Sequence, residues 1–147
     1  MKILPVNEMN LAGAAAVHAA SWRESHREIC SLEFVAAHTT QRQMDYLRKE
    51  LEQGKRVFLL LDPEPVGVVS VHGELIENLY VLPEAERRGY GTALLDHACS
   101  LCRAPVLWVL NTNGKAREFY EHRGFGYTGR QKRLNDRLAE LEMKKDG

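Results

Sequence analysis

The sequence predicts a single α+β domain, residues 1–147, in which helices cover both faces of a central sheet. Three observations support this prediction. Short segments rich in β-branched and aliphatic residues recur along the chain, and segments with apolar residues at helical spacing separate them. Three of the strand-like segments follow one another through short turns, which favours antiparallel pairing. The chain of 147 residues is also long enough to bury the core of one domain.

The chain begins with a strand and two helical regions. Lys2 to Val6 can form the first strand. Asn10 is the expected N-cap of an alanine-rich helix that runs to about Ser25, and Ser31 opens the second helical region.

That second region is expected to break in its middle. Thr40 with Gln43 forms a capping-box pattern, so a new helix is expected to begin there. Gly54 then ends this helix, because glycine is the preferred residue just past a helix C-terminus.

Three strands follow and form the antiparallel set. The first is Arg56–Leu61, and residues 62–65 form a proline-rich turn. The second is Val66–His72, and Gly73 reverses the chain into a third strand that begins at Leu75.

The stretch from Leu75 to Cys102 reads as strand, loop and helix, and the rest of the chain is organised around it. Gly89 and Gly91 allow backbone angles and close approaches that a side chain would forbid, so successive N–H groups can point at one ligand. A helix that starts near Tyr90 adds the positive end of its dipole.

Two arginines complete this loop. Arg87 and Arg88 add full positive charges beside the glycines, so a polyphosphate is the natural ligand. A two-glycine loop is by itself a weak signal, and the residues around it decide the interpretation.

The remaining elements are a strand, a short helix and a hairpin. Pro105–Leu110 is expected to be a buried strand, and Lys115–Arg123 a helix. Gly126–Arg133 and Arg137–Lys144 can pair around Asn135–Asp136. The hairpin offers a strand edge that could pair with a second copy, so a homodimer is one expectation.

Composition excludes several classes of function. The 20 basic and 20 acidic residues balance, so neither nucleic acid nor a membrane is an expected partner. No apolar run approaches the ~20 residues of a membrane helix, and no signal peptide opens the chain. An odd number of cysteines, three, favours a reducing compartment, so we expect a cytoplasmic protein.

Metal and hydrolase chemistry are not expected. Cys99 and Cys102 form a Cys-x-x-Cys, but it lies inside a predicted helix without a second pair, so we interpret both as helix positions, with Cys102 facing the core. The histidines show no ligand spacing, and no Gly-x-Ser-x-Gly elbow is present.

Two segments carry a resemblance to a known family. Leu79–Pro83 leading into Arg87–Leu95 looks like the acyl-CoA signature of the GNAT acetyltransferases. Residues 111–125 resemble the same family's Asn-x-x-Ala-x-x-Phe-Tyr-x-x-x-Gly-Phe segment. The two motifs occur in the family's order with a strand between them. The resemblance covers the chain in element order and is firm from about Glu77 to Gly129.

The resemblance implies a mixed, mostly antiparallel sheet in which the strand ending near Val81 splays from the one ending near Leu110. It implies an N-acetyltransferase that moves the acetyl group of acetyl-CoA to a primary amine by direct transfer in a ternary complex. The pantetheine arm would lie against the backbone of the first strand and the pyrophosphate on the loop. The implied cofactor-binding residues are Leu79, Tyr80, Val81, Arg87, Arg88, Gly89, Tyr90, Gly91, Thr92, Asn113 and Tyr120.

Two positions differ from, or leave a choice in, the cofactor-binding residues that the resemblance implies. Asn113 matches the family's CoA-contacting asparagine, although Asn111 is an alternative. Glu86 stands where the family usually has Gln or Arg, and a carboxylate pointing inward would repel a pyrophosphate.

Glu77 is the candidate base. An alkyl amine with a pKa of about 10 is protonated at neutral pH, so a nearby base or a water chain helps to deprotonate it. Glu77 has the same strand parity as Leu79 and Val81, so its carboxylate is expected on the face that the motif lines. The family often carries its base or water-holding residue here. An exposed strand glutamate without a catalytic role is the alternative, and Glu74 is a second choice.

Tyr120 is the candidate acid, because its phenol matches the family's proton donor to the CoA thiolate. Phe119 and Tyr120 are neighbours on a helix and point about 100° apart, one into the core. A tyrosine that only packs is the alternative. A backbone N–H near Val81 would serve the oxyanion, because fixed amides need no reorganisation.

The acceptor side is the least determined. In the family it is formed by the first helices, here residues 22–33, so Trp22 and His26 together with Glu77 are the candidate substrate-binding residues. Trp22 on an alanine-rich helix can instead belong to the core. The amine stays open among a small molecule, a polyamine, an antibiotic and a protein terminus. A non-catalytic acyl-CoA-binding or sensing domain is the rival, and a nucleotide site is a more distant one, since the P-loop pattern is missing.

Overall fold

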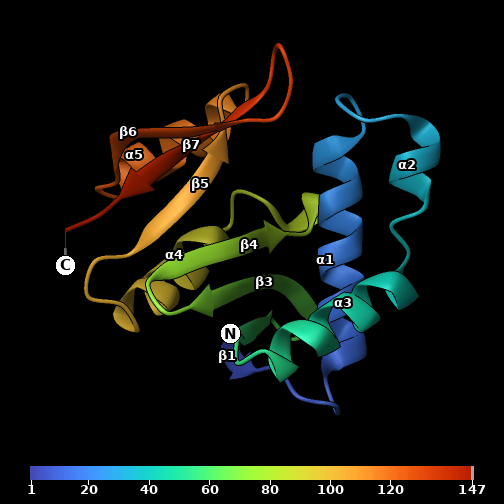
Figure 1. Ribbon diagram of the computed structural model, residues 1–147. Coiled ribbons are helices and arrows are strands. Elements are labelled where there is room, and N and C mark those ends of the chain that lie inside the picture. Colours follow the sequence, from blue (N-terminus) through green and yellow to red (C-terminus); the bar gives the residue numbers. More distant parts are fainter. Residues whose placement is uncertain (147) are drawn as a thin grey trace.

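The computed structural model describes residues 1–146 and is built on one seven-stranded sheet in the order β1-β2-β3-β4-β5-β7-β6 (Figure 1). The pair β4 and β5 is parallel, and every other neighbouring pair is antiparallel. This is the mixed, mostly antiparallel sheet that the resemblance implied. The strands are β1 (Lys2–Pro5), β2 (Arg56–Leu61), β3 (Pro65–His72), β4 (Leu75–Val81), β5 (Val106–Leu110), β6 (Gly126–Arg133) and β7 (Ala139–Lys144).

Helices lie on both faces of the sheet, as predicted. On one face α1 and α3 enclose a core around Leu11, Leu47 and Leu59, and on the other α4 encloses a core around Leu94 and Leu95. The helices are α1 (Leu11–His26), α2 (Leu32–Ala36), α3 (Thr40–Glu52), α4 (Tyr90–Ser100) and α5 (Gly114–His122), with a 3-10 turn at Pro83–Ala85.

Helix α4 packs very closely on β3. A Cβ atom added to Gly67 would lie 2.6 Å from Cδ1 of Leu94 and 3.2 Å from the carbonyl oxygen of Tyr80, so a larger residue would force Leu94 to shift. The close packing fixes where the first turn of α4 meets the sheet.

The helix starts differ in detail from the sequence prediction. The second helical region does break, into α2 and α3, but the N-cap of α3 is Thr39, whose hydroxyl accepts from the N–H of Arg42 at 3.2 Å. The predicted box of Thr40 with Gln43 was one residue late and is wrong, because Gln43 turns into the protein interior instead. Asn10 stands at the start of α1, but its side chain bonds to Asn7 and Pro5 and does not cap the helix.

A β-bulge interrupts β4 and overturns the parity argument for Glu77. Asn78 has a φ of 52°, and the register with β3 shifts beside it. Ile76 and Leu79 therefore pack into the α4 core, whereas Tyr80 packs into the α1 core. Glu77 consequently faces α3, on the opposite side of the sheet from Leu79, because the extra residue reverses the alternation.

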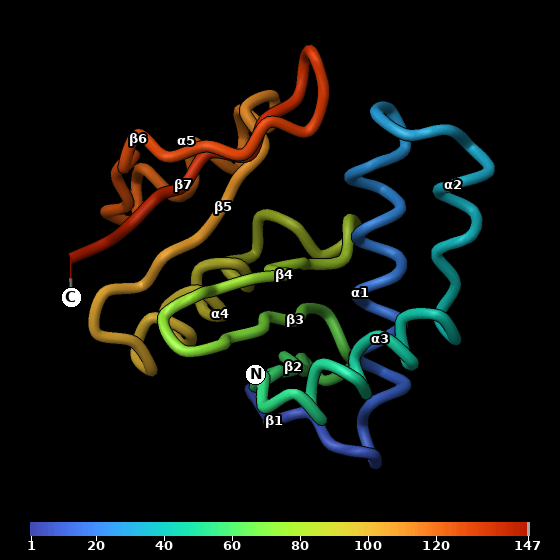
Figure 2. The backbone as a smooth tube through the Cα atoms, in the orientation of Figure 1, coloured from blue at the N-terminus to red at the C-terminus, as the bar shows by residue number. Residues whose placement is uncertain are grey.

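The splay between the two central strands is present. A single register pair, Leu75 with Val106, joins β4 to β5. Beyond it β5 turns away towards the β6–β7 hairpin (Figure 2), and there it pairs with β7 from Val106 to Leu110. The β4 edge after Leu75 therefore has no partner strand within residues 1–146.

The hairpin forms as predicted and places β6 at an outer edge of the sheet. Every residue of β6 is exposed. A search of residues 1–146 finds no helix with the length and hydropathy to span a membrane. Cellular location and oligomeric state remain predictions.

Candidate active site

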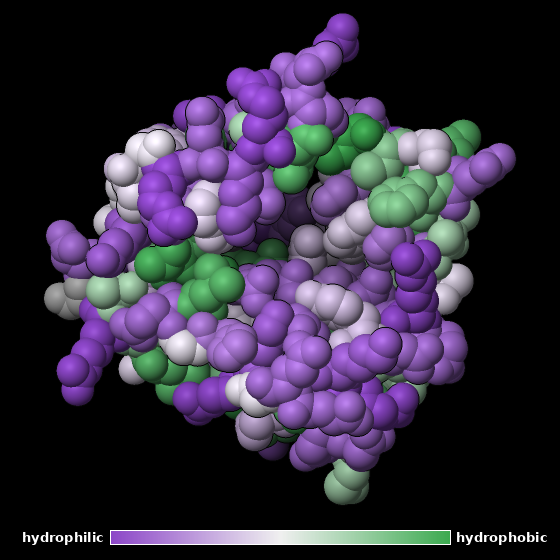
Figure 3. Space-filling view, in the orientation of Figure 1, coloured by the Kyte–Doolittle hydropathy of each residue, from purple (hydrophilic) through white to green (hydrophobic). Residues whose placement is uncertain are grey.

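The open edge of β4 and the loop that follows it form one side of the candidate site. Figure 3 shows a hollow in this face of the molecule, between the β5–β7 side and the end of α1. Leu79 and Val81 lie at the splay and are half-buried against the α4 core. Backbone groups at an unpaired strand edge must find another partner, so this edge can bind an extended ligand that carries amides.

The loop between β4 and α4 exposes a run of free amides. Arg87 and Gly89 both have left-handed backbone angles, with φ of 66° and 83°. After Glu86, the next N–H to make a backbone hydrogen bond is that of Ala93, which donates to Gly89. Within residues 1–146 the N–H groups of residues 87–92 therefore have no hydrogen-bond acceptor. An αL residue beside free amides and a helix N-terminus is typical of an anion cradle.

The side chains of the loop divide into two groups. Arg87 and Arg88 are exposed, as is Glu86. The ring of Tyr90 instead turns inward, and its hydroxyl donates to Asp62 at 2.5 Å. Tyr90 can therefore offer a ligand only its backbone N–H, whereas the charged groups surround the cradle in solvent.

Tyr120 lies under the splay, on α5. Its ring packs edge-on against Phe119, at 5.4 Å between centroids, and against Phe125, at 5.9 Å. Burial raises the pKa of the Tyr120 phenol to about 12. The phenol therefore keeps its proton at neutral pH.

The two candidate asparagines have different surroundings. The side chain of Asn111 is occupied, because it donates to the carbonyl of Arg137 and accepts from the N–H of Ala139. Asn113 caps α5 by accepting from the N–H of Ala116 at 3.1 Å, which leaves its amide group free to donate. This arrangement favours Asn113.

Glu77 belongs to a cluster of charges at the C-terminal end of α3. The Nζ atom of Lys55 lies 3.1 Å from Oε1 of Glu77 and 2.8 Å from Oε2 of Glu50. Burial lowers the pKa of Lys55, but the two carboxylates outweigh it and leave the pKa above its ordinary value. Glu74, the second choice for a base, instead accepts from two backbone N–H groups after α4, at 2.8 and 2.7 Å.

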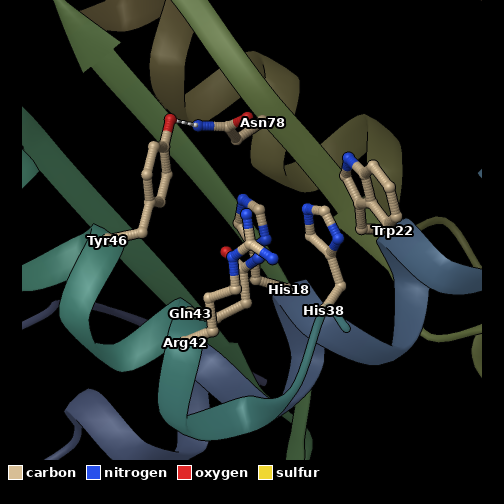
Figure 4. Close-up of a pocket in the computed structure, with 7 residues that line it drawn as sticks. All are labelled: His18, Trp22, His38, Arg42, Gln43, Tyr46 and Asn78. Atoms are coloured by element: carbon tan, nitrogen blue, oxygen red, sulfur yellow. Dashed lines mark hydrogen bonds between the residues drawn. The ribbon is translucent and has the colours of Figure 1, made fainter. Parts of the chain in front are cut away.

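A pocket of about 250 Å³ lies between α1, α3 and the bulge of β4 (Figure 4). The phenol of Tyr46 accepts from the side-chain amide of Asn78 at 3.3 Å, which ties α3 to the bulge. The residues that line it are His18, Trp22, His38, Arg42, Gln43, Tyr46 and Asn78.

Trp22 contributes to this wall, and His26 does not. The Trp22 ring is stacked between two imidazoles, with centroids 3.4 Å from His38 and 4.0 Å from His26. His38 lines the pocket, whereas His26 lies behind the indole. Arg23 donates to the carbonyl of His38 and so holds the segment before α3 against α1.

Sequence reasoning missed most of the pocket. One local signal was available for His18, which stands four residues before Trp22 and therefore on the same face of α1. Asn78 was a second, because asparagine inside a strand favours a bulge or an αL position. His38, Arg42, Gln43 and Tyr46 carry no such signal, since only the packing of α3 against α1 brings them together.

His18 is expected to make the fold sensitive to acid. Burial lowers its pKa from 6.5 to about 4, so the unfolded chain binds a proton between these values that the folded chain does not. The stabilisation present above pH 6.5 should be lost as the pH falls, by about 3 kcal/mol at pH 4. Urea unfolding of the protein and of His18→Leu at pH 7 and pH 4.5 tests this. Parallel losses in both proteins would contradict it.

The described residues hold no group of three or more His, Cys, Asp or Glu side chains placed to bind a metal ion. Cys99 and Cys102 are free and half-buried. Cys99 lies in the last turn of α4, but the helix ends at Ser100, so the prediction of Cys102 as a helix position is wrong, although it packs against the α4 core as expected.

The chain is thus an α+β protein with a splayed central sheet, a loop of unpaired amides and a pocket on the other side of the bulge. The family model for the acetyltransferase (GNAT) family matches residues 15–125, and the chain belongs to this family. The resemblance and the enzyme class predicted from the two motifs agree with this assignment.

A curated relative is also an acetyltransferase. The peptidyl-lysine N-acetyltransferase YjaB of Salmonella typhimurium is 36% identical over 67 residues, which are 46% of this chain and 46% of that protein. The match therefore spans less than half the length of this curated relative.

Two solved structures share the fold. A GCN5-related N-acetyltransferase from Rhodopseudomonas palustris has a TM-score of 0.77 and 23% identity, over 99% of this chain and 95% of its own. The PaiA N-acetyltransferase from Thermoplasma acidophilum, solved in complex with coenzyme A, has a TM-score of 0.75 and 18% identity over the full length of both chains.

Proposed function

We propose that this protein is an N-acetyltransferase that moves the acetyl group of acetyl-CoA to a primary amine by direct transfer in a ternary complex. The observation that supports this best is the pairing of an unpartnered β4 edge with a loop of free amides at the N-terminus of α4. The first suits the amides of pantetheine, and the second suits a diphosphate. The Thermoplasma neighbour was solved with coenzyme A.

The residues present fit the cofactor. Leu79 and Val81 would offer backbone groups to the pantetheine arm, with Tyr80 between them. Asn113 would donate its free amide. The diphosphate would lie on the loop, where the backbone of Gly89, Tyr90, Gly91 and Thr92 and the side chains of Arg87 and Arg88 are available.

Acetyl-CoA supplies an acyl thioester, which an amine can attack only when it carries a lone pair. We assign deprotonation of the amine to Glu77, acting through water. The carboxylate faces the acceptor side of β4, but Lys55 neutralises part of its charge. A water molecule is therefore the expected carrier between Glu77 and an amine at the bulge.

Tyr120 is assigned the opposite proton transfer, because its phenol stays protonated at neutral pH. It would donate to the leaving sulfur as the bond between carbon and sulfur breaks. A backbone N–H near Val81 would stabilise the oxyanion, and the bulge holds that part of the chain in place.

The acceptor amine would enter from the pocket between α1 and α3, where Trp22 forms part of the wall. His26 would act through the stack with Trp22, and Glu77 would lie at the inner end. The Salmonella relative is named a peptidyl-lysine N-acetyltransferase, which supports a peptide amine beside a small-molecule amine as the acceptor.

The test is a calorimetric titration of the purified protein with acetyl-CoA, followed by release of free thiol across a panel of amines. We expect saturable binding and thiol release that depends on the amine. The double variant Arg87→Gln/Arg88→Gln should weaken acetyl-CoA binding, whereas Arg27→Gln, whose side chain pairs with Glu24 on α1, should not. Absence of acetyl-CoA binding would refute the interpretation of the loop.

A non-catalytic acyl-CoA-binding or sensing domain is the second candidate, and two observations favour it. Glu86 places a carboxylate in the loop, and Lys55 holds Glu77 in an ion pair. Tight acetyl-CoA binding without thiol release from any amine would support this candidate over the transferase.

A further inference from the structure

Arg42 is a positively charged side chain at the pocket without a partner. Among residues 1–146 it makes no ion pair and no side-chain hydrogen bond. Three nearby cations are engaged: Arg23 with the carbonyl of His38, Arg48 with Glu8, and Lys55 with two carboxylates. The lining residues include no carboxylate that could neutralise Arg42.

Arg42 is also an unusual residue for its position, the first turn of α3. Thr39 caps the helix and bonds to the N–H of Arg42, so the arginine lies in the first turn, and that turn contains no acidic residue. The N-terminus of a helix favours negative charge, so a cation there is unfavourable. An anion bound at this end of the pocket would pair with both the guanidinium and the helix dipole.

Two buried polar side chains beside it also lack partners. His18 and Gln43 are 3% and 4% exposed, and they line the same pocket as Arg42. Neither imidazole nitrogen of His18 has a hydrogen-bond partner, nor does Oε1 of Gln43. Figure 4 shows that His18 and His38 direct their imidazoles into the space between α1 and α3. Polar groups buried without partners are rare, and a ligand with N–H donors would satisfy them.

The pocket is polarised along α3. Arg42, Tyr46 and Glu50 follow one another at intervals of four residues and so share a helix face, about 12 Å from end to end. Beyond the lining residues, at the C-terminal end of α3, Glu50 and Glu77 pair with Lys55. An occupant would therefore place its anionic group towards Arg42 and its amine towards Glu77.

We propose that the acceptor carries a carboxylate at the opposite end from its reacting amine, and that Arg42 is the residue that selects for it. This inference rests on the proposed function, because it treats the pocket as the acceptor site. The ligand chemistry is that of a free amino acid or of a lysine next to an acidic residue in a peptide. Arg42 would pair with the carboxylate, while His18 and Gln43 would accept from the N–H groups.

The chain provides a binding signal that does not depend on turnover. Its two tryptophans are Trp22, in the pocket wall, and Trp108, on β5. In a Trp108→Phe background, Trp22 fluorescence reports occupancy of the pocket alone. We would titrate the free amino acids and their carboxamides with and without coenzyme A. A blocked Asp-Lys dipeptide and its Asn-Lys counterpart would form a second arm.

We expect the carboxylate member of at least one pair to bind about tenfold more tightly than its neutral counterpart. Arg42→Gln should abolish this difference and raise KM with little change in kcat, whereas Arg48→Gln, on the same helix but paired with Glu8, should keep it. The arm that responds identifies the source of the carboxylate.

Equal affinities within every pair, no fluorescence response from any ligand, or a preference that survives Arg42→Gln would each overturn the proposal. Calorimetry with acetyl-CoA on the same samples distinguishes failure of the proposed function from failure of the proposed role of Arg42. Loss of acetyl-CoA binding refutes the transferase, whereas intact acetyl-CoA binding without carboxylate selection refutes only the role of Arg42.

Discussion

Replacement of Tyr120 by phenylalanine is expected to lower kcat about 100-fold or more while acetyl-CoA affinity stays nearly unchanged. The phenol keeps its proton because burial raises its pKa to about 12, and no hydrogen bond to another residue is found for it within residues 1–146. The change therefore removes the proposed acid and keeps the ring contacts with Phe119 and Phe125. Thiol release and calorimetry measure the two quantities.

Tyr127→Phe is the matched control for this experiment. That phenol is exposed at the surface, where it bonds to Arg117 and Glu121 at 2.9 Å each. We expect its loss to leave turnover intact. If Tyr120→Phe keeps the turnover of the parent protein, Tyr120 is a packing residue and the thiolate takes its proton from water.

Replacement of Lys55 by methionine is expected to reduce the free energy of unfolding by about 3 kcal/mol. Glu50 is 5% exposed, and Lys55 lies between it and Glu77, so the substitution leaves a buried carboxylate without its counter-charge. Urea unfolding at pH 7 measures the loss. Lys49→Met, at an exposed position of α3, is the control and should change stability little.

The pH range of this contribution follows from the direction of the Lys55 pKa. The pKa is raised in the folded state, so the stabilisation is fully present below the ordinary value of 10.5 and is lost as the pH rises through the folded value. The double variant Lys55→Met/Glu50→Gln should recover most of the loss, because it removes the buried Glu50 charge together with Lys55 and leaves only the more exposed Glu77 carboxylate. A double variant as unstable as the single one would show that packing of the Lys55 chain, rather than charge, is responsible.

The element order, the strand–loop–helix unit and the family could all be predicted from sequence patterns. These features are local. The glycines and arginines of residues 87–91 define the loop, and the spacing from Asn111 to Phe125 defines the second motif. Hydrophobic periodicity and turn residues act over a few neighbours, so a linear pattern is enough to predict them.

The face of Glu77 and the composition of the proposed acceptor pocket depend on contacts between distant parts of the chain. The bulge at Asn78 adds one residue to β4, and a shift of one residue sends every following side chain to the other face. A bulge depends on pairing with β3, which alternation within a single strand does not encode.

The pocket also depends on contacts between elements that lie far apart in the sequence. His18, Arg42 and Asn78 come from α1, α3 and β4, and each looks unremarkable within its own element. They meet because α1 and α3 pack their apolar faces on one side of the sheet, and that burial is not directional. It determines which surfaces touch, and only the completed packing determines which polar side chains are left facing one another between them.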